Sequence, residues 1–259
     1  MATKATAVAD WMERAWLKEP PHVERSPRRV RGYLAGQVVV DSERVLLVYE
    51  SKRPPMYWFP LDDVRMELLR RKEPASVSSS DTVRFGLSAG ERVVENAAWT
   101  YEPPRPGLEA LKGHLAFIWD QLDSWFEEDE EVFVHPRDPY TRVDAIHSSR
   151  HVRVEIEGTV VAETRRPVLL FETGLRVRYY IPKQDVRMDL LEPTQTRTRC
   201  PYKGIASYWT AVIDGKRFED VVWSYPTPLP ETAKIENLLS FYNEKVDIYI
   251  DGKPERVER

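Results

Sequence analysis

The sequence predicts a mainly β protein, of a β-rich α+β class, made of two tandem domains of short antiparallel strands. Its 259 residues are enough for two domains of about 120 residues each. Residues 28–69 align with residues 150–191 without a gap, and 17 of these 42 positions are identical. In both repeats, short runs of β-branched and aromatic residues follow one another closely. This spacing favours antiparallel pairing, because parallel strands need long crossover connections.

The chain opens with residues 8–18, which predict a helix that docks on the first domain. The apolar residues of this stretch fall at helical intervals and form one stripe. These residues are Val8, Trp11, Met12 and Trp16. Pro20 and Pro21 follow and end the predicted helix, because proline has no backbone N–H to donate.

Each repeat then predicts the same strands in the same order. The opening hairpin has its strands at 38–40 and 45–50, and at 160–161 and 168–172. Aromatic runs follow at 57–60 and 179–182, and each leads into an Asp-Val-Arg-Met sequence. Further strands are expected at 97–101 and around 122–126, and at 221–225 and 246–250.

One short helix is expected in each repeat, at 108–117 and at 232–241. Between the repeats, the acidic run 127–131 reads as a solvated linker, whereas the apolar residues 132–134 are expected to lie against a domain. The predicted organisation is a helix and lead-in at 1–27, a first repeat at 28–126, a linker at 127–149, a second repeat at 150–252 and a tail at 253–259.

Composition excludes several classes of function. A net charge of −4 gives no general attraction to nucleic acid or to an anionic membrane. The single cysteine excludes both an internal disulfide framework and a zinc site built from paired cysteines. No apolar run approaches the ~18 residues of a membrane span, and the N-terminus has no hydrophobic signal core. We expect a cytoplasmic protein with no metal and no cofactor.

One loop differs between the repeats. Residues 198–209 of the second repeat read Thr-Arg-Cys-Pro-Tyr-Lys-Gly-Ile-Ala-Ser-Tyr-Trp, whereas residues 76–85 of the first contain no Cys, no Pro-Tyr-Lys-Gly and no Tyr-Trp. Cys200 lies near Arg199 and Lys203, whose charges would favour a nucleophilic thiolate. The sequence places no histidine near Cys200 that could act as its base. Two alternatives to a nucleophile therefore remain: a thiol that contacts a ligand, and a buried packing residue.

The rest of the loop suggests a binding site. Pro201 and Gly204 allow a sharp turn close to a ligand, from which Lys203 would project toward an anionic group. A plain turn with a solvated lysine is the alternative. Aromatic side chains in and near the loop would line a pocket for a flat ring or a cation, or simply pack in the core. These are Tyr202, Tyr208, Trp209, Trp223 and Tyr225.

Several aromatic and polar positions are predicted to be structural. The first repeat keeps Trp223 and Tyr225 as Trp99 and Tyr101, so those two read more as scaffold than Tyr208 and Trp209 do. Asp-Val-Arg occurs at 63–65 and at 185–187. It is predicted to place Asp and Arg on one strand face, where they form a structural ion pair with each other or with neighbours. In residues 194–199, threonines alternate with Gln and Arg, so one strand face carries hydroxyls and the other is largely basic. That basic face suits an anionic ligand or solvent.

The Cys-Pro-Tyr-Lys-Gly motif followed by Tyr-Trp resembles domain-of-unknown-function family 427, also labelled nucleotidyltransferase-like. The resemblance covers about 28–126 and 150–252. It implies a β-tent fold, with a pocket between two small antiparallel sheets, similar to the ligand-binding domain of cereblon and to yippee-like proteins. Their zinc, held by two Cys-x-x-Cys pairs, does not carry over to a chain with one cysteine. The Gly-Ser turn of nucleotidyltransferases is absent as well, and the nearest carboxylate pair, Asp62-Asp63, is Gln184-Asp185 in the second repeat.

Three functions follow as hypotheses. The first is a small-molecule binding module in the second repeat, with a ring-containing or anionic ligand held by Cys200, Tyr202, Lys203, Gly204, Tyr208, Trp209 and Trp223. The second is an enzyme that uses Cys200 or Lys203 in the reacting centre. The third is a structural or interaction protein in which neither repeat has a working pocket.

Overall fold

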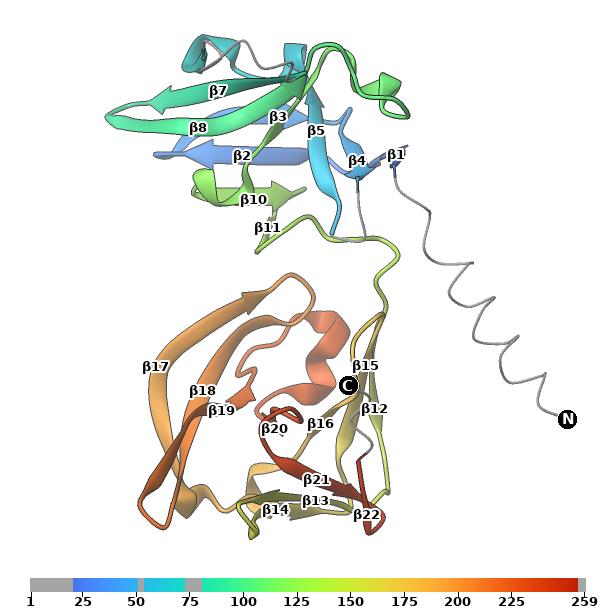
Figure 1. Ribbon diagram of the computed structural model, residues 1–259, viewed down its shortest axis with the longest axis vertical. Helices are drawn as coiled ribbons and strands as arrows, with labels where there is room; N and C mark the ends of the chain where they lie inside the picture. Colours follow the sequence, from blue (N-terminus) through green and yellow to red (C-terminus); the bar gives the residue numbers. More distant parts are fainter. Residues whose placement is uncertain (1–20, 51–53, 73–80, 256–259) are drawn as a thin grey trace, which may run out of the picture. The chain divides into compact units, whose positions relative to one another are not determined.

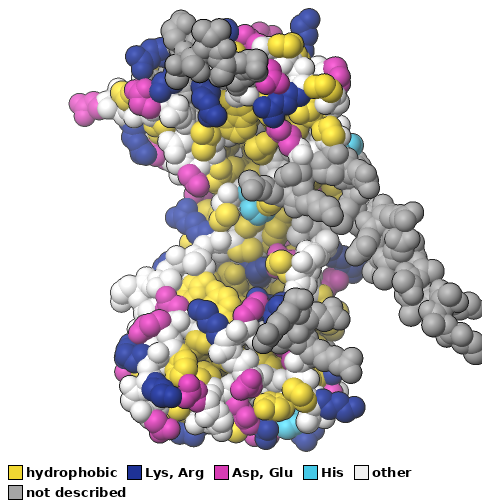
Figure 2. Space-filling model, viewed as in Figure 1, with side chains coloured by type: hydrophobic (Ala, Val, Ile, Leu, Met, Phe, Trp, Pro, Cys, Tyr) yellow, Lys and Arg dark blue, Asp and Glu magenta, His cyan; other side chains and the backbone are white. Residues whose placement is uncertain are grey.

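A computed structural model describes residues 21–50, 54–72 and 81–255 (Figure 1). The chain is mainly β, as predicted, and it divides into two compact units, Met1–Tyr140 and Thr141–Arg259. The helix predicted at 8–18 lies outside the described residues, as does part of the predicted tail. Figure 2 shows acidic and basic side chains interspersed over the visible face of each unit.

The first unit forms two antiparallel sheets. Its strands are β1 (His22–Arg25), β2 (Val30–Leu34), β3 (Gln37–Ser42), β4 (Leu46–Tyr49), β5 (Met56–Pro60), β6 (Leu69–Arg71), β7 (Thr82–Ala89), β8 (Arg92–Tyr101), β9 (His114–Phe117), β10 (Ser124–Glu127) and β11 (Glu130–Val132). One sheet has the order β1-β4-β5-β9-β8-β7-β6, and the other β11-β10-β2-β3. Short 3-10 helices connect them: η1 (Leu61–Asp63), η2 (Met66–Leu68), η3 (Glu109–Leu111) and η4 (Trp119–Gln121).

The second unit repeats this plan. Its strands are β12 (Val143–His147), β13 (Val152–Ile156), β14 (Thr159–Thr164), β15 (Val168–Glu172), β16 (Arg178–Tyr180), β17 (Leu191–Cys200), β18 (Gly204–Ile213), β19 (Lys216–Ser224), β20 (Leu239–Phe241), β21 (Asp247–Ile250) and β22 (Lys253–Pro254). The sheet orders are β12-β15-β16, β17-β18-β19-β20 and β14-β13-β21-β22. The 3-10 helices are η5 (Lys183–Asp185), η6 (Met188–Leu190) and η7 (Pro230–Ile235).

The first two of these sheets correspond to the single seven-stranded sheet of the first unit. Between β16 and β20 only an isolated bridge remains, in which Ile181 and Leu239 exchange backbone hydrogen bonds of 2.7 and 2.8 Å. Unit 2 therefore has a break where unit 1 has a continuous sheet. The predicted helical stretches at 108–117 and 232–241 are shorter than expected, because each begins as η3 or η7 and ends as strand β9 or β20.

The acidic run 127–131 is solvated as expected except at Glu127, but it is not a linker, which corrects that part of the expectation. It forms the β10–β11 hairpin on the edge of the smaller sheet of unit 1. Glu127 is buried, and its carboxylate accepts hydrogen bonds from Arg28, at 2.5 Å, and from the Tyr57 hydroxyl. These two donors compensate the burial of a charge. Val132 is buried as expected, whereas Val134 is half exposed.

The Asp-Val-Arg sequences do not form ion pairs on strand faces. Asp63 and Asp185 end the 3-10 helices η1 and η5, and each binds an arginine and a hydroxyl from elsewhere in its own repeat. Asp63 contacts Arg44 at 2.5 Å and Ser42 at 2.6 Å; Asp185 contacts Arg166 at 3.1 Å and Thr164 at 2.7 Å. The predicted structural ion pair is present, with neighbours as partners, but each Asp lies at the end of a 3-10 helix and not on a strand face.

Each unit has a large and a small hydrophobic cluster. The large cluster of unit 1 is built around Phe59 and Trp125, and that of unit 2 around Ile181 and Phe241. The small cluster of unit 2 joins Ala145 of β12, Leu170 of β15 and Ile235 of η7 to aromatic residues of β16, β18 and β19. It therefore lies between the β12-β15-β16 sheet and the β17-β18-β19-β20 sheet, next to the predicted loop.

Candidate functional site

Aromatic side chains gather around Cys200 in the small cluster of unit 2. We call this set the tyrosine cluster; it consists of Tyr180, Tyr208, Trp223, Tyr225, Tyr242 and Cys200. Tyr180 is fully buried, and Tyr208, Trp223 and Tyr225 nearly so. Cys200 and Tyr242 are only partly buried, so they form the accessible edge of the cluster. Of the predicted site residues, the structure brings Cys200, Tyr208 and Trp223 together.

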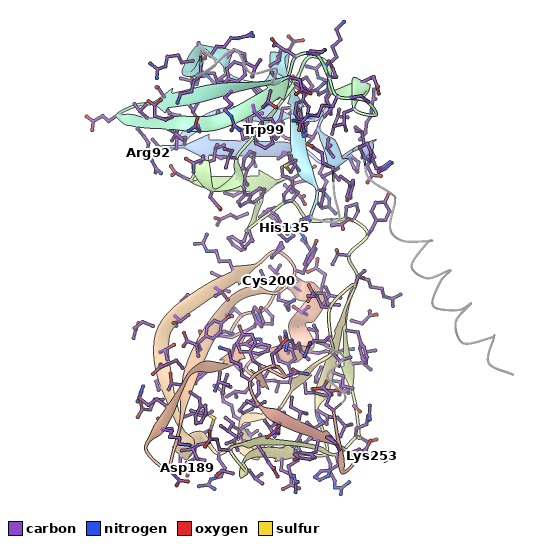
Figure 3. The ribbon with its side chains drawn as sticks, in the orientation of Figure 1. Arg92, Trp99, His135, Asp189, Cys200 and Lys253 are labelled. Atoms are coloured by element: carbon purple, nitrogen blue, oxygen red, sulfur yellow. The ribbon has the colours of Figure 1, made fainter. Side chains whose placement is uncertain are left out.

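The Cys-Pro-Tyr-Lys-Gly segment forms the turn between β17 and β18 (Figure 3 labels Cys200 at this end of β17). Cys200 pairs with Gly204, which adopts a φ of +96°. A Cβ at Gly204 would lie 3.3 Å from the Thr227 carbonyl oxygen, so glycine is needed for both its conformation and its size. The expected sharp turn is confirmed. Its residues are buried, including Tyr202, because the 227–229 segment covers them and Leu229 donates to the Lys203 carbonyl at 3.2 Å.

Lys203 does not project from the turn, which corrects both expectations for this residue. Its ammonium group forms a salt bridge and hydrogen bond with Glu172 at the end of β15. The two side chains are only 11% and 9% exposed. A charge removed from water needs such a partner, so the pair fastens the turn to β15. The amine is consequently occupied by Glu172 rather than presented to an anionic ligand.

Hydroxyl groups form a hydrogen-bonded chain on one side of the cluster. The hydroxyls of Thr198 and Tyr208 lie 2.7 Å apart, and those of Tyr208 and Tyr242 lie 3.4 Å apart. The Trp223 indole N–H donates to the Tyr180 hydroxyl at 3.2 Å. Burial raises the pKa of Tyr180 and of Tyr225, and the proximity of Cys200 adds to both shifts. These phenols therefore stay protonated at neutral pH, and the neutral Tyr180 hydroxyl is the acceptor for Trp223.

The accessible edge of the cluster presents aromatic faces. The rings of Trp223 and Tyr242 lie 4.5 Å apart, centre to centre, at an angle of 45°. The Arg178 guanidinium lies 5.5 Å from the Trp223 ring centre and 5.7 Å from that of Tyr242. Its charge is met by Glu244 at 2.8 Å. The edge therefore combines aromatic surface with hydroxyl groups, and its arginine is already paired with a carboxylate.

Trp209 does not belong to this site, which corrects the prediction that Tyr208 and Trp209 act together. Successive side chains of a strand point to opposite faces, so the two neighbours on β18 diverge. Tyr208 joins the tyrosine cluster, whereas Trp209 packs against the large cluster of unit 2. The Lys183 ammonium lies 5.9 Å from the Trp209 ring centre. Trp209 therefore stabilises the other face of the sheet.

The basic strand face beside the loop offers little to an anion. Thr194 and Thr196 each donate to Asp220 at 2.7 Å, as the predicted hydroxyl face allows. Arg197 turns back onto its own strand and donates to the carbonyls of Thr194 and Thr196 at 3.1 and 2.7 Å. Arg197 is thus engaged by its own backbone.

The cluster has weak means for covalent chemistry. His151, which directly precedes β13, contacts Glu163 of β14 at 2.7 Å, and neither residue belongs to the tyrosine cluster. In the described part of the chain, no three His, Cys, Asp or Glu side chains are grouped so as to hold a metal ion. A thiol with hydroxyl neighbours, and without an imidazole in the cluster, is better suited to contacting a ligand than to nucleophilic attack.

Three important residues were not singled out from the sequence as site residues. Glu172 ends strand β15 after a run of apolar residues, and a charged residue in that position indicates that it has a partner of opposite charge. Tyr180 replaces Trp58 of the first repeat, a change that provides a hydroxyl at a buried position. Tyr242 directly follows β20 and gives no local signal, because its position depends on how β20 packs beside β19.

Comparison with known proteins identifies the family. A family model matches residues 22–128 and, a second time, residues 144–252. No curated protein matches the chain. In the described part of the chain, no helix has the length and apolar character required to cross a membrane. The two matches cover most of the sequence and both repeats, so the chain belongs, in two tandem copies, to the family described as Domain of unknown function (DUF427).

Proposed function

We propose that the second unit is a small-molecule binding module whose site is the accessible edge of the tyrosine cluster. The observation that carries this proposal is the convergence of Cys200, Tyr208, Trp223 and Tyr242 between two sheets, with two members only partly buried. Ligand sites typically combine aromatic surface with a few well-placed polar groups. A β-tent arrangement, in which a pocket lies between two small sheets, is part of this proposal.

The ligand that suits this edge is a neutral, flat ring with hydrogen-bonding groups. Aromatic faces favour a ring, and the hydroxyl chain from Thr198 to Tyr242 supplies donors and acceptors. An anionic ligand is less well supported, because Lys203 and Arg178 are already paired with carboxylates. The Glu172–Lys203 pair holds the turn in place and does not contact the ligand directly.

An enzyme that uses Cys200 or Lys203 is the weaker alternative. The Lys203 amine is held by Glu172, and His151 of the same repeat contacts Glu163. A binding role requires only that the thiol contacts the ligand and that the lysine fixes the turn.

The test is a binding screen of the full chain with adenosine, uridine, their monophosphates and succinimide. A compound present at about 100 times its Kd should stabilise the protein by about 2.7 kcal/mol in thermal unfolding. Tyr208→Phe removes the central hydroxyl of the chain and should weaken binding of that compound about tenfold by calorimetry. Trp209→Phe, on the opposite face of β18, is the matched control and should bind as the parent does.

Two results would contradict this proposal. One is that no compound of the screen stabilises the protein. The other is that Trp209→Phe loses as much affinity as Tyr208→Phe, which would place the site on the other face of the sheet. A monophosphate that binds much more tightly than its nucleoside would instead establish an anion site.

A further inference from the structure

The second unit has a groove of about 530 Å³, and none of the residues that line it belongs to the tyrosine cluster. Its apolar lining consists of Ile156 of β13, Phe218 of β19 and Val246, which directly precedes β21. Ile156 is 2% exposed, whereas Phe218 and Val246 are partly exposed where they pack against the large cluster of unit 2. A volume of this size is typical of sites for small molecules.

In the first unit, an aspartate closes the matching place. The Asp123 carboxylate accepts the Ala35 N–H at 2.6 Å and forms a salt bridge of 2.6 Å with Arg92, which Figure 3 labels. The Asp123 N–H donates to the Tyr33 carbonyl at 2.8 Å. One residue thus ties the β2–β3 turn and the start of β8 to the segment that leads into β10.

Valine takes the place of this aspartate in the second unit. Strand β10 begins opposite Tyr33 and β21 begins opposite Glu155, and these two positions correspond in the repeats. Asp123 and Val246, which precede the two strands, therefore correspond as well. A valine side chain can neither accept a hydrogen bond nor pair with a cation. The β13–β14 turn is therefore not fastened by the side chain of residue 246, and both line the groove.

The rim of the groove carries more acidic than basic side chains. Its charged residues are Glu155, Glu157, Glu244, Asp247 and Lys245. Three of the four carboxylates are paired with basic residues that do not line the groove. The pairs are Glu155–Arg153, Glu157–Lys216 and Glu244–Arg178.

Asp247 is the carboxylate that is available to a ligand. It is exposed and has no cationic partner among the described residues. Phe218 adds an aromatic ring to the same groove. A carboxylate and an aromatic ring both favour positive charge, and the apolar lining favours a carbon skeleton. The groove therefore combines space for a small molecule with a preference for a cation.

We propose that this groove binds a small organic amine with an apolar body. The ammonium group contacts Asp247, and the body covers Ile156, Phe218 and Val246. The excess of carboxylates on the rim selects a cation over an anion of the same shape. This site is independent of the function proposed for the tyrosine cluster, because the two share no residue.

The test is an NMR titration of the isotope-labelled full chain with phenethylamine near neutral pH. The amine should shift the backbone amide resonances of residues 155–157 and 243–247 in a saturable way. Phenethyl alcohol has the same body without the charge and should bind about fivefold more weakly. Hydrocinnamate carries the opposite charge and should not bind.

Three results of this titration overturn the proposal. The first is that phenethylamine causes no saturable shifts. The second is that hydrocinnamate or phenethyl alcohol binds as tightly as the amine. The third is that the shifts are confined to the tyrosine cluster, at Tyr208 and Trp223, because the amine then occupies the other site.

Substitutions decide whether Asp247 and the groove are responsible. Asp247→Asn keeps the shape of the side chain and removes its charge, so phenethylamine affinity should fall about fivefold. Asp120→Asn, at an exposed aspartate of the first unit, is the control and should change nothing. Val246→Trp fills the groove and should abolish the shifts. Equal binding to Asp247→Asn and the parent overturns the proposal, even if Val246→Trp fails to fold.

A cation from the chain itself is the alternative occupant. Residues 256–259 lie outside the described residues and include Arg256 and Arg259. A variant with both arginines changed to alanine should bind phenethylamine as the parent does. If the amine binds only to this variant, a cation of the chain occupies the groove, and the proposal is wrong.

Discussion

The two units share their scaffold, and one carboxylate that they have in common has different partners in each. Glu172 of the second unit is paired with Lys203 of the Cys200 turn, whereas Glu50 of the first unit accepts, among the described residues, a hydrogen bond from the Tyr101 hydroxyl only. Strand order and the hydroxyl–Asp–Arg contacts are otherwise repeated. Contacts that occur in both units are those that the fold requires. The partner of this carboxylate differs between the units, so it bears on what each unit can bind.

The largest expected effect concerns the Glu172–Lys203 ion pair of the second unit. Lys203→Met leaves Glu172 buried without its cation, and it should lower the free energy of unfolding by about 3 kcal/mol or more. Lys216→Met removes a lysine from an exposed pair with Glu157, with side chains 64% and 52% exposed, and should leave stability nearly unchanged. Denaturant unfolding of both variants checks this. Equal effects would show that the Glu172–Lys203 pair is not a structural anchor.

A smaller effect is expected from the glycine of the same turn. Gly204→Ala forces a positive φ on alanine and places its methyl group against the Thr227 carbonyl, so it should cost about 2 kcal/mol. Gly174→Ala shares the positive φ but meets no atom within 4 Å, and should cost about 1 kcal/mol. Thermal unfolding measures both. If the two substitutions cost the same, close packing of the turn does not matter.

The shared scaffold predicts equal effects in the two units. Asp63→Asn and Asp185→Asn each weaken the contacts to an arginine and a hydroxyl, and each should cost about 1 kcal/mol. Hydrogen bonds from arginine lower the pKa of both carboxyls. Their contribution is therefore complete above the unfolded pKa near 3.8 and is lost as the pH falls through the lowered value. Unfolding followed from neutral to acid pH should show similar changes for both variants; a clear inequality would mean that the repeats use this contact differently.

The smallest expected effect occurs at alkaline pH and concerns Tyr101 of the first unit. Burial, followed by the hydrogen bond to Glu50, raises the pKa of Tyr101 from 10.0 to about 12. The stability that depends on its protonated form is complete below pH 10 and is lost as the pH rises through about 12. In an absorbance titration, Tyr101→Phe should show one phenol fewer than the parent protein among those that titrate near pH 12. Loss of a group near pH 10 instead would mean that Tyr101 does not donate to Glu50.

The sequence predicts the fold better than it predicts the site. Repeated strand patterns and turns are local, so the strands and the tandem organisation follow from residues 28–69 and 150–191. The acidic run was misassigned because Glu127 is stabilised by Arg28 and Tyr57, which are distant in sequence. Partners of this kind leave no local signal.

Prediction of the site from the sequence is limited in the same way. Cys200 and Tyr208 were identified from their motif, and the conformation of Gly204 followed from its residue type. The sequence did not show that Lys203 meets Glu172, because that pair joins a turn to a strand thirty-one positions earlier. Trp209 was wrongly grouped with Tyr208, although strand alternation alone separates neighbours once residues 204–213 are assigned to one strand.

The central claim is that the Cys200 side of the second unit binds a small molecule, and labelling of Cys200 tests it most directly. Cys200 is the single cysteine of the chain, so any reaction with a chromogenic disulfide reagent reports on this site. We predict that a saturating compound from the screen slows labelling in the parent and in Trp209→Phe. In Tyr208→Phe, the same protection should require about tenfold more compound. Labelling that proceeds at one rate with and without every stabilising compound would contradict the claim.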